Sequence, residues 1–169
     1  MAYLLPLIHH LREPRNKRGF RGVIVAPTRE LASQIFRECQ KLSEPRKLRP
    51  FIIDKVAKSA KKISGQKLDI LITTPNRLVY MINSQSISLK NVEWLIVDES
   101  DKLFETTGKG EKSFRDQLAI IHRYIQLSKN YIHVLCFRTS HYITKAKMRI
   151  FLIFSYTERY IFMDFNMYS

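Results

Sequence analysis

Four short, continuous apolar runs constrain the fold of this chain more than any other feature. They occupy residues 22–26, 51–53, 69–72 and 93–97. Their apolar residues follow one another without a polar alternation, as in strands that other elements cover on both faces. Strands of this kind are typical of parallel sheets in α/β proteins. We therefore expect these runs to be neighbouring strands of a buried sheet.

Helical patterns separate the four runs. Between residues 29 and 42 the apolar residues recur at helical spacing, and Thr28 precedes them as an N-cap candidate. A second helix is expected after Thr74, with Pro75 in its first turn. Two more helices are predicted over residues 55–62 and 114–121, and a loop is predicted over residues 106–113. The alternation of strands and helices predicts a parallel α/β sheet with right-handed crossovers.

One strand ends in a group of carboxylates. The run Leu95-Ile96-Val97 leads directly into Asp98 and Glu99, and Asp101 follows two residues later. Adjacent acids at the end of a buried strand are how many NTPases hold Mg²⁺ and orient the attacking water. The phosphate loop that accompanies them in such enzymes, G-x-x-x-x-G-K-[ST], occurs nowhere in the 169 residues.

The composition suggests a polyanionic partner. The 169 residues suit one domain, and they carry a net charge of +14. A surplus of this size indicates nucleic acid more often than a membrane surface. The apolar stretch at 150–165 is interrupted by charged residues, so no membrane span is expected. Cys39 and Cys136 form no disulfide framework, and Cys39 is expected to be buried and reduced.

Three candidate motifs follow three of the predicted strands. They occupy residues 26–32, 73–78 and 97–102. In α/β sheets, ligands bind at the carboxyl ends of the strands, so the three segments are expected to meet at one site. Each helix start there offers unpaired N–H groups and a positive dipole end, which suit a phosphate.

In this order and strand context, the motifs resemble the first RecA-like domain of DEAD-box ATP-dependent RNA helicases. Residues 27–32 are similar to the family's motif Ia, and residues 74–77 to motif Ib, with Asn76 where Gly is usual. Residues 98–101 resemble motif II, with Ser100 in place of Ala. Ser100, residues 102–105 and residues 114–118 resemble the subfamily that assists small-ribosomal-subunit assembly. The resemblance implies ATP and Mg²⁺ as cofactors, RNA and pre-ribosomal particles as partners, and the nucleus and nucleolus as the location.

The resemblance also implies a role for each motif residue. Asp98 would hold Mg²⁺ through water, Glu99 would polarise the hydrolytic water, and Asp101 would couple the nucleotide site to RNA. The RNA backbone would be bound, without sequence readout, by Pro27, Thr28, Arg29, Thr74, Pro75 and Arg77. Simpler roles remain open, since the two threonines can act as helix caps alone and the two arginines can be surface or ion-paired residues.

The resemblance covers residues 1–121, interpreted as a partial RecA-like (P-loop NTPase-type) domain that is incomplete at its N-terminus. Residues 2–8 look like the helix that follows the phosphate loop in these helicases. The phosphate loop, the first strand, a Ser-Ala-Thr motif III and the second RecA-like domain are therefore expected to be missing. Residues 122–169 are interpreted as an irregular, aromatic-rich tail, because no Gly or Pro follows residue 111. Within it, residues 132–137 can form a strand, and residues 145–154 a helix or a strand.

The sequence therefore predicts a fragment of an ATP-dependent RNA helicase that acts on pre-ribosomal RNA. Without a phosphate loop, the chain alone is not expected to hydrolyse ATP or unwind RNA. Two alternatives stay open: a non-catalytic module that binds RNA or a protein partner, and a truncated product that does not fold stably.

Overall fold

Seven strands form a single sheet in the order β2-β3-β1-β4-β5-β6-β7. The sheet belongs to a computed structural model that describes residues 3–99, 113–125, 132–138, 147–154 and 160–166. Strands β2, β3, β1, β4 and β5 are parallel, and β6 and β7 extend the sheet in antiparallel fashion. Their bounds are β1 Gly22–Val25, β2 Pro50–Ile52, β3 Ile70–Thr73, β4 Trp94–Val97, β5 Ile132–Arg138, β6 Lys147–Phe154 and β7 Tyr160–Asn166.

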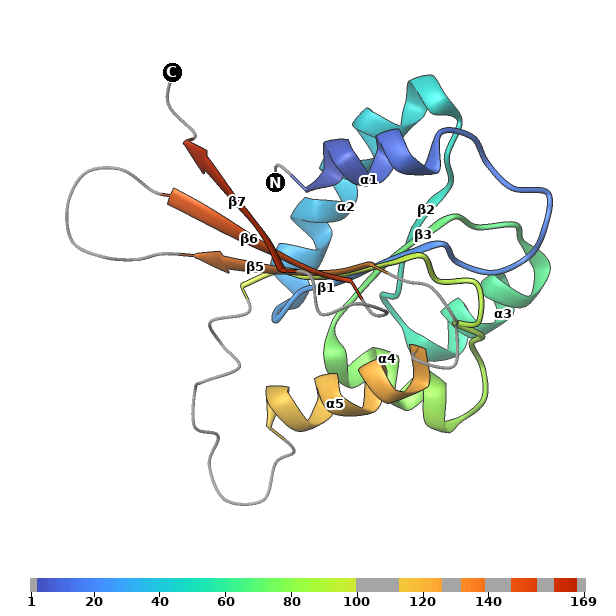
Figure 1. The fold of residues 1–169 in the computed structure, drawn as a ribbon. Coiled ribbons are helices and arrows are strands. Elements are labelled where there is room, and N and C mark those ends of the chain that lie inside the picture. Colours follow the sequence, from blue (N-terminus) through green and yellow to red (C-terminus); the bar gives the residue numbers. More distant parts are fainter. Residues whose placement is uncertain (1–2, 100–112, 126–131, 139–146, 155–159, 167–169) are drawn as a thin grey trace.

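Helices cover both faces of the parallel part of the sheet. As Figure 1 shows, α1 and α2 lie on one face, while α3, α4 and α5 lie on the other. This layering is the one that continuous apolar strands require, because each face needs its own apolar cover. The bounds are α1 Leu4–Leu11, α2 Arg29–Ser43, α3 Val56–Gly65, α4 Pro75–Asn83 and α5 Phe114–Ile125, with a 3₁₀ turn at Glu44–Arg46.

Successive strand residues divide between two buried clusters. Ile24 and Ile96 join the cluster under α1 and α2, whereas Val25 and Val97 join the cluster under α4 and α5. The α1 side is closely packed at Gly22, where a Cβ atom would lie 3.1 Å from a methyl group of Leu7. A glycine at this strand position therefore allows α1 to rest directly on the sheet.

The strands and helices predicted from the first 121 residues are confirmed. Each of the four predicted strands is present, and its bounds differ from the prediction by no more than one residue at either end. The helix predicted at 29–42 extends to Ser43, and the one predicted at 114–121 extends to Ile125. The helix expected at 55–62 occupies Val56–Gly65. The predicted loop at 106–113 lies outside the described residues, except for Ser113.

The tail contributes more regular structure than its sequence predicted. The strand expected at 132–137 is present as β5, and the segment at 145–154, left open between helix and strand, forms β6. Strand β7 was not predicted. β-Branched and aromatic residues favour strands. Antiparallel pairing needs no crossover helix, so β6 and β7 can join the sheet without the helix and the Gly- or Pro-containing turns of an α/β unit.

Charged side chains are paired at the edge where the parallel strands begin. Arg21 is buried and donates to both carboxylate oxygens of Glu93, at 3.0 and 3.2 Å, and also to the carbonyl oxygen of Leu11. The Asp69 side chain, only 1% exposed, accepts hydrogen bonds from the backbone N–H and the guanidinium of Arg49. These pairs connect the segment after α1 to the starts of β2, β3 and β4.

The expectation that Cys39 is buried is confirmed. Trp94 is also buried, and His9 and His10 lie exposed on α1. Burial raises the pKa of the Cys39 thiol to about 11, so this thiol is protonated at neutral pH. Among the helices that the structure describes, none combines the length and the apolar character needed to cross a membrane.

Candidate functional site

Three strands end level with one another, and this brings the three motifs to one edge of the sheet. Val25 of β1 is paired with Thr73 of β3 on one side and with Val97 of β4 on the other. Neighbouring strands lie about 4.8 Å apart, so the residues that follow these three positions are close in space. Segments 26–29, 74–77 and 98–99 therefore share the carboxyl edge, as predicted.

The first segment starts α2 with a side-chain cap. Thr28 has an extended backbone, and its Oγ1 accepts a hydrogen bond of 3.2 Å from the N–H of Leu31. Pro27 is half-buried before it, and Arg29 is exposed as the first helical residue. The capping role considered for Thr28 is confirmed, and the cap leaves the Arg29 side chain free to reach into solvent at this edge.

The second segment starts α4 differently. Thr74 occupies the N-cap position and is buried, but its side chain makes no capping hydrogen bond. Its carbonyl oxygen instead accepts from the N–H of Leu78 at 3.1 Å and from the hydroxyl of Thr73 at 3.2 Å. The side-chain capping considered for Thr74 is thus wrong, while Pro75 is buried in the first turn as expected.

Arg77 is fixed on the side of this edge that faces β2. Its Nη1 donates a 2.6 Å hydrogen bond to the carbonyl oxygen of Ile53, and its Nη2 lies 3.8 Å from Oδ1 of the exposed Asp54. Burial lowers the pKa of Arg77, and the charge of Arg29 lowers it further, while Asp54 opposes the shift. The positive charges of Arg29 and Arg77 therefore repel each other across the two helix starts, and the negative charge of Asp54 partly compensates for this repulsion.

The carboxylates at the end of β4 are held by backbone and side-chain donors. Oδ2 of Asp98 accepts a 2.6 Å hydrogen bond from the Tyr3 hydroxyl, and Oδ1 accepts one of 2.9 Å from the N–H of Glu99. The N–H of Asp98 donates to the carbonyl oxygen of Val25. Glu99 follows with a left-handed φ of 49°. Asp101, the third predicted acid, lies outside the described residues.

Asp98 presents a carboxylate that could hold Mg²⁺ through water molecules. Among the described residues there is no group of three His, Cys, Asp or Glu side chains that could hold a metal ion. Mg²⁺ is commonly bound through one or two carboxylates and keeps several of its waters. An oriented, half-buried carboxylate such as that of Asp98 matches this mode.

Sequence reasoning missed Tyr3. Residues 2–8 were recognised as a helical segment, but no partner was predicted for the tyrosine. Tyr3 is 1% exposed, and a buried tyrosine hydroxyl usually has a hydrogen-bond partner. A tyrosine in the otherwise apolar segment 2–8 was thus a signal that some polar group lies nearby, although the sequence could not identify it as Asp98.

Comparison with known proteins shows the family of the chain. The sequence model described as DEAD/DEAH box helicase matches residues 1–150 of the chain. A relative from Bos taurus, named probable ATP-dependent RNA helicase DDX52, is 54% identical over 126 residues, which are 72% of this chain and 20% of the relative. The ATP-dependent RNA helicase ROK1 of Saccharomyces cerevisiae is 40% identical over 116 residues, 63% of this chain and 21% of the relative. The chain thus spans about one fifth of the length of these relatives.

Solved structures show the same fold. The yeast DEAD-box splicing factor Prp28 superposes with a TM-score of 0.62 at 29% identity, covering 75% of this chain and 30% of Prp28. Mss116p bound to single-stranded RNA and AMP-PNP gives a TM-score of 0.61 at 27% identity, covering 77% of this chain and 27% of that protein.

The hydrogen bond from Tyr3 to Asp98 can be tested through stability. We expect Tyr3→Phe to lower the free energy of unfolding by about 2 kcal/mol, because the half-buried carboxylate of Asp98 loses a hydrogen-bond donor. Urea unfolding of the full chain measures the change. Tyr80→Phe removes a hydroxyl from a side chain that is 61% exposed and should leave the midpoint unchanged. Equal midpoints for the Tyr3 and Tyr80 variants would contradict the assignment.

Proposed function

Because this chain belongs to the DEAD/DEAH box helicase family, we propose that it forms the RNA-binding and carboxylate-bearing part of an RNA-dependent ATPase. The observation that carries the proposal is the level ending of β1, β3 and β4. It brings two helix starts with arginines next to the adjacent acids of β4. One group suits a polyanion and the other suits a metal-bound nucleotide.

The two helix starts supply the RNA-binding side of the proposal. Helix N-termini favour anions through free N–H groups and the helix dipole. Arg29 and Arg77 add two formal charges, and their mutual repulsion in the free protein is relieved when a phosphate lies between them. The other residues proposed for this surface supply no pattern of donors and acceptors that would distinguish one base from another. They are Pro27, Thr28, Thr74 and Pro75. Binding through sugar and phosphate is therefore independent of sequence.

The end of β4 supplies the nucleotide side. Asp98 would hold Mg²⁺ through water, since the donors from Tyr3 and Glu99 fix its carboxylate and leave lone pairs free. Mg²⁺ bound with ATP neutralises charge on the transferred phosphate. Glu99 would orient and polarise the attacking water, and Asp101 is proposed, from the resemblance of residues 98–101 to motif II, to link the two sides.

For the whole helicase to which this part would belong, we propose pre-ribosomal RNA as substrate and the nucleolus as location. Ser100 and the segment at 114–118 support this choice, because they resemble the subfamily that assists small-ribosomal-subunit assembly. The basic charge of +14 suits a particle rich in RNA.

The RNA edge is tested by Arg29→Gln. The substitution removes an exposed charge at the start of α2 without touching the core, so folding should be unchanged. We expect affinity for a short oligo(U) to fall about fivefold at 0.1 M salt and the salt slope to decrease by about 0.7, the value for one phosphate contact on a single strand. Fluorescence anisotropy over a salt series measures both quantities.

Arg46→Gln provides the matched control, because Arg46 is an exposed arginine at the far end of α2. This variant should bind oligo(U) like the unmodified chain. If the two variants lose affinity equally, binding depends on net charge and the proposed edge is wrong.

A second prediction concerns ATP. The 169-residue chain contains no phosphate-loop motif, so Asp98 and Glu99 would act on phosphates that no N–H cradle holds. We expect RNA binding that does not depend on nucleotide, with no RNA-stimulated phosphate release. Release that RNA stimulates and Asp98→Asn abolishes would contradict this expectation and show a complete active site.

The substrate proposal is tested in cells. Crosslinking the tagged parent protein and sequencing the attached RNA should enrich precursors of the small ribosomal subunit over messenger RNA. Enrichment of messenger or spliceosomal RNA instead would assign the protein to another branch of the family.

A further inference from the structure

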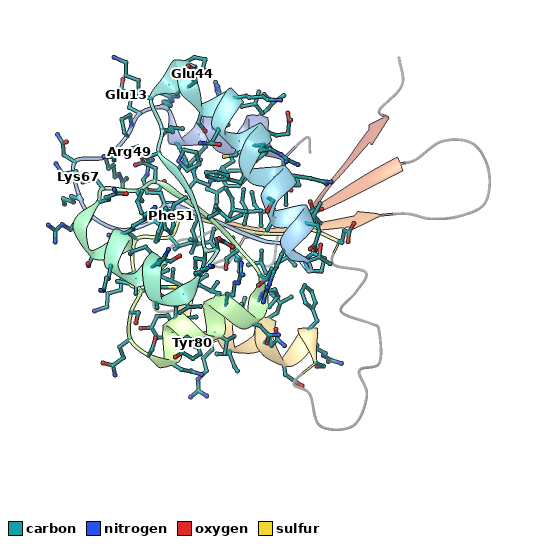
Figure 2. All side chains as sticks on the ribbon, turned by 180° about the vertical axis from the view of Figure 1, so that it is seen from behind. Glu13, Glu44, Arg49, Phe51, Lys67 and Tyr80 are labelled. Atoms are coloured by element: carbon teal, nitrogen blue, oxygen red, sulfur yellow. The ribbon has the colours of Figure 1, made fainter. Side chains whose placement is uncertain are left out.

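A hollow of about 440 Å³ lies beside the proposed RNA edge, between α2, the edge strand β2 and α3. Its apolar lining includes the half-buried rings of Phe36 and Phe51, from α2 and β2. In Figure 2, Phe51 lies between α2 and α3. The volume falls within the range of ligand-binding clefts, and the two rings are part of its lining.

Three lysines form the other side of this hollow. Lys55, Lys58 and Lys62 are exposed and line it from α3 and its N-cap position, at spacings of three and four residues that place them on one helix face. Within the described part of the chain, none of the three has a carboxylate partner. The lining includes one described carboxylate, Asp54, which lies 3.8 Å from Arg77 and is partly offset by it.

The hollow adjoins the edge that carries Arg77, because Asp54, one of its lining residues, lies 3.8 Å from the Arg77 guanidinium. The Arg77 guanidinium donates to the carbonyl oxygen of Ile53, two residues before Lys55. From Lys55 to Lys62 the helix advances about 10 Å, which extends the positive surface away from the Arg29–Arg77 site. A strand bound at that site therefore meets a second cationic segment flanked by two aromatic rings.

We propose that this groove, defined by Phe36, Phe51, Lys55, Lys58 and Lys62, binds the continuation of a single-stranded RNA held at the Arg29–Arg77 edge. The lysines would contact phosphates, and the rings would stack on bases without reading their identity. The proposal rests on the proposed RNA function and extends it by a second subsite. RNA suits the groove better than an acidic peptide, because the groove combines flat aromatic faces with cations and adjoins the RNA edge directly.

The test compares a short and a long RNA on the full chain, with oligo(U) probes of about 6 and about 15 nucleotides, lengths that single-stranded sites cover. The long probe should bind more tightly. Lys58→Glu with Lys62→Glu should reduce its affinity on the order of 25-fold at 0.1 M salt and lower its salt slope by about 1.4, as for two lost phosphate contacts. Binding of the short probe should change far less.

Lys67→Glu with Lys90→Glu is the matched control, since both lysines are exposed and precede β3 and β4 at the opposite edge. The control should bind both probes like the unmodified chain, apart from any general charge effect. If the charge reversal on α3 lowers the urea midpoint, Lys58→Gln with Lys62→Gln tests the same contacts and keeps good helix formers.

The outcomes separate this proposal from the function it extends. The groove proposal is wrong if both variant pairs lose the same RNA affinity, or if the long probe binds no more tightly than the short one. Either result leaves the proposal for the Arg29–Arg77 edge unaffected. Failure to bind either probe overturns both. Crosslinks from 4-thiouridine in the long probe should map to peptides containing Phe36 or Phe51. The groove would instead be assigned to an acidic protein by three results together. These are no such crosslinks, unchanged RNA affinity of the Lys58 and Lys62 variant, and binding of poly-glutamate that depends on these two lysines.

Discussion

The arrangement of the candidate site depends on the register of β1 with its two neighbours. Val25 is paired with both Thr73 and Val97, so three chain segments leave the sheet at the same level. A shift of one residue in either pairing would move a segment by about 3.3 Å and turn its apolar side chains to the opposite face. The two buried clusters therefore fix the register, and the register positions the charged residues. Packing and site geometry follow from the same pairing.

Charged side chains are paired at one edge of the parallel strands, whereas several at the other edge are exposed without a carboxylate partner in the part of the chain that the structure describes. Where the strands begin, Arg21 with Glu93 and Asp69 with Arg49 are paired and largely withdrawn from solvent. Breaking such a buried pair on one side is strongly destabilising, so these charges serve the fold. Where the strands end, Arg29 is exposed and has no carboxylate partner among the described residues. The same is true of the three exposed lysines that continue from this edge along α3. Charges left in this state contribute little to the fold and remain available to a polyanion.

Local patterns explain why much of the fold could be predicted and part of the site could not. Continuous apolar runs and the Thr28 cap are properties of short segments, so the strands and α2 follow from the sequence within about one residue. The bond from Tyr3 to Asp98 joins residues 95 positions apart, and no local pattern encodes it. The contact of Arg77 with the Ile53 carbonyl joins residues 24 positions apart, which no local pattern encodes either. The segment of β6 was left open between helix and strand, and antiparallel β7 was not predicted, because neither is preceded by the helical spacer that marks an α/β unit.

The nucleotide and RNA sides of the proposed site share one short backbone connection. The N–H of Asp98 donates to the carbonyl oxygen of Val25 at 2.9 Å, and three residues after Val25 the chain reaches the Thr28 cap. A shift of the carboxylate-bearing turn would therefore act on β1 directly, and β1 leads into the helix start that carries Arg29. Asp98 is also fixed on its side-chain side, because its Oδ2 accepts a hydrogen bond from the hydroxyl of Tyr3, the N-cap residue of α1. The two proposed sides are therefore joined by hydrogen bonds through the end of β1.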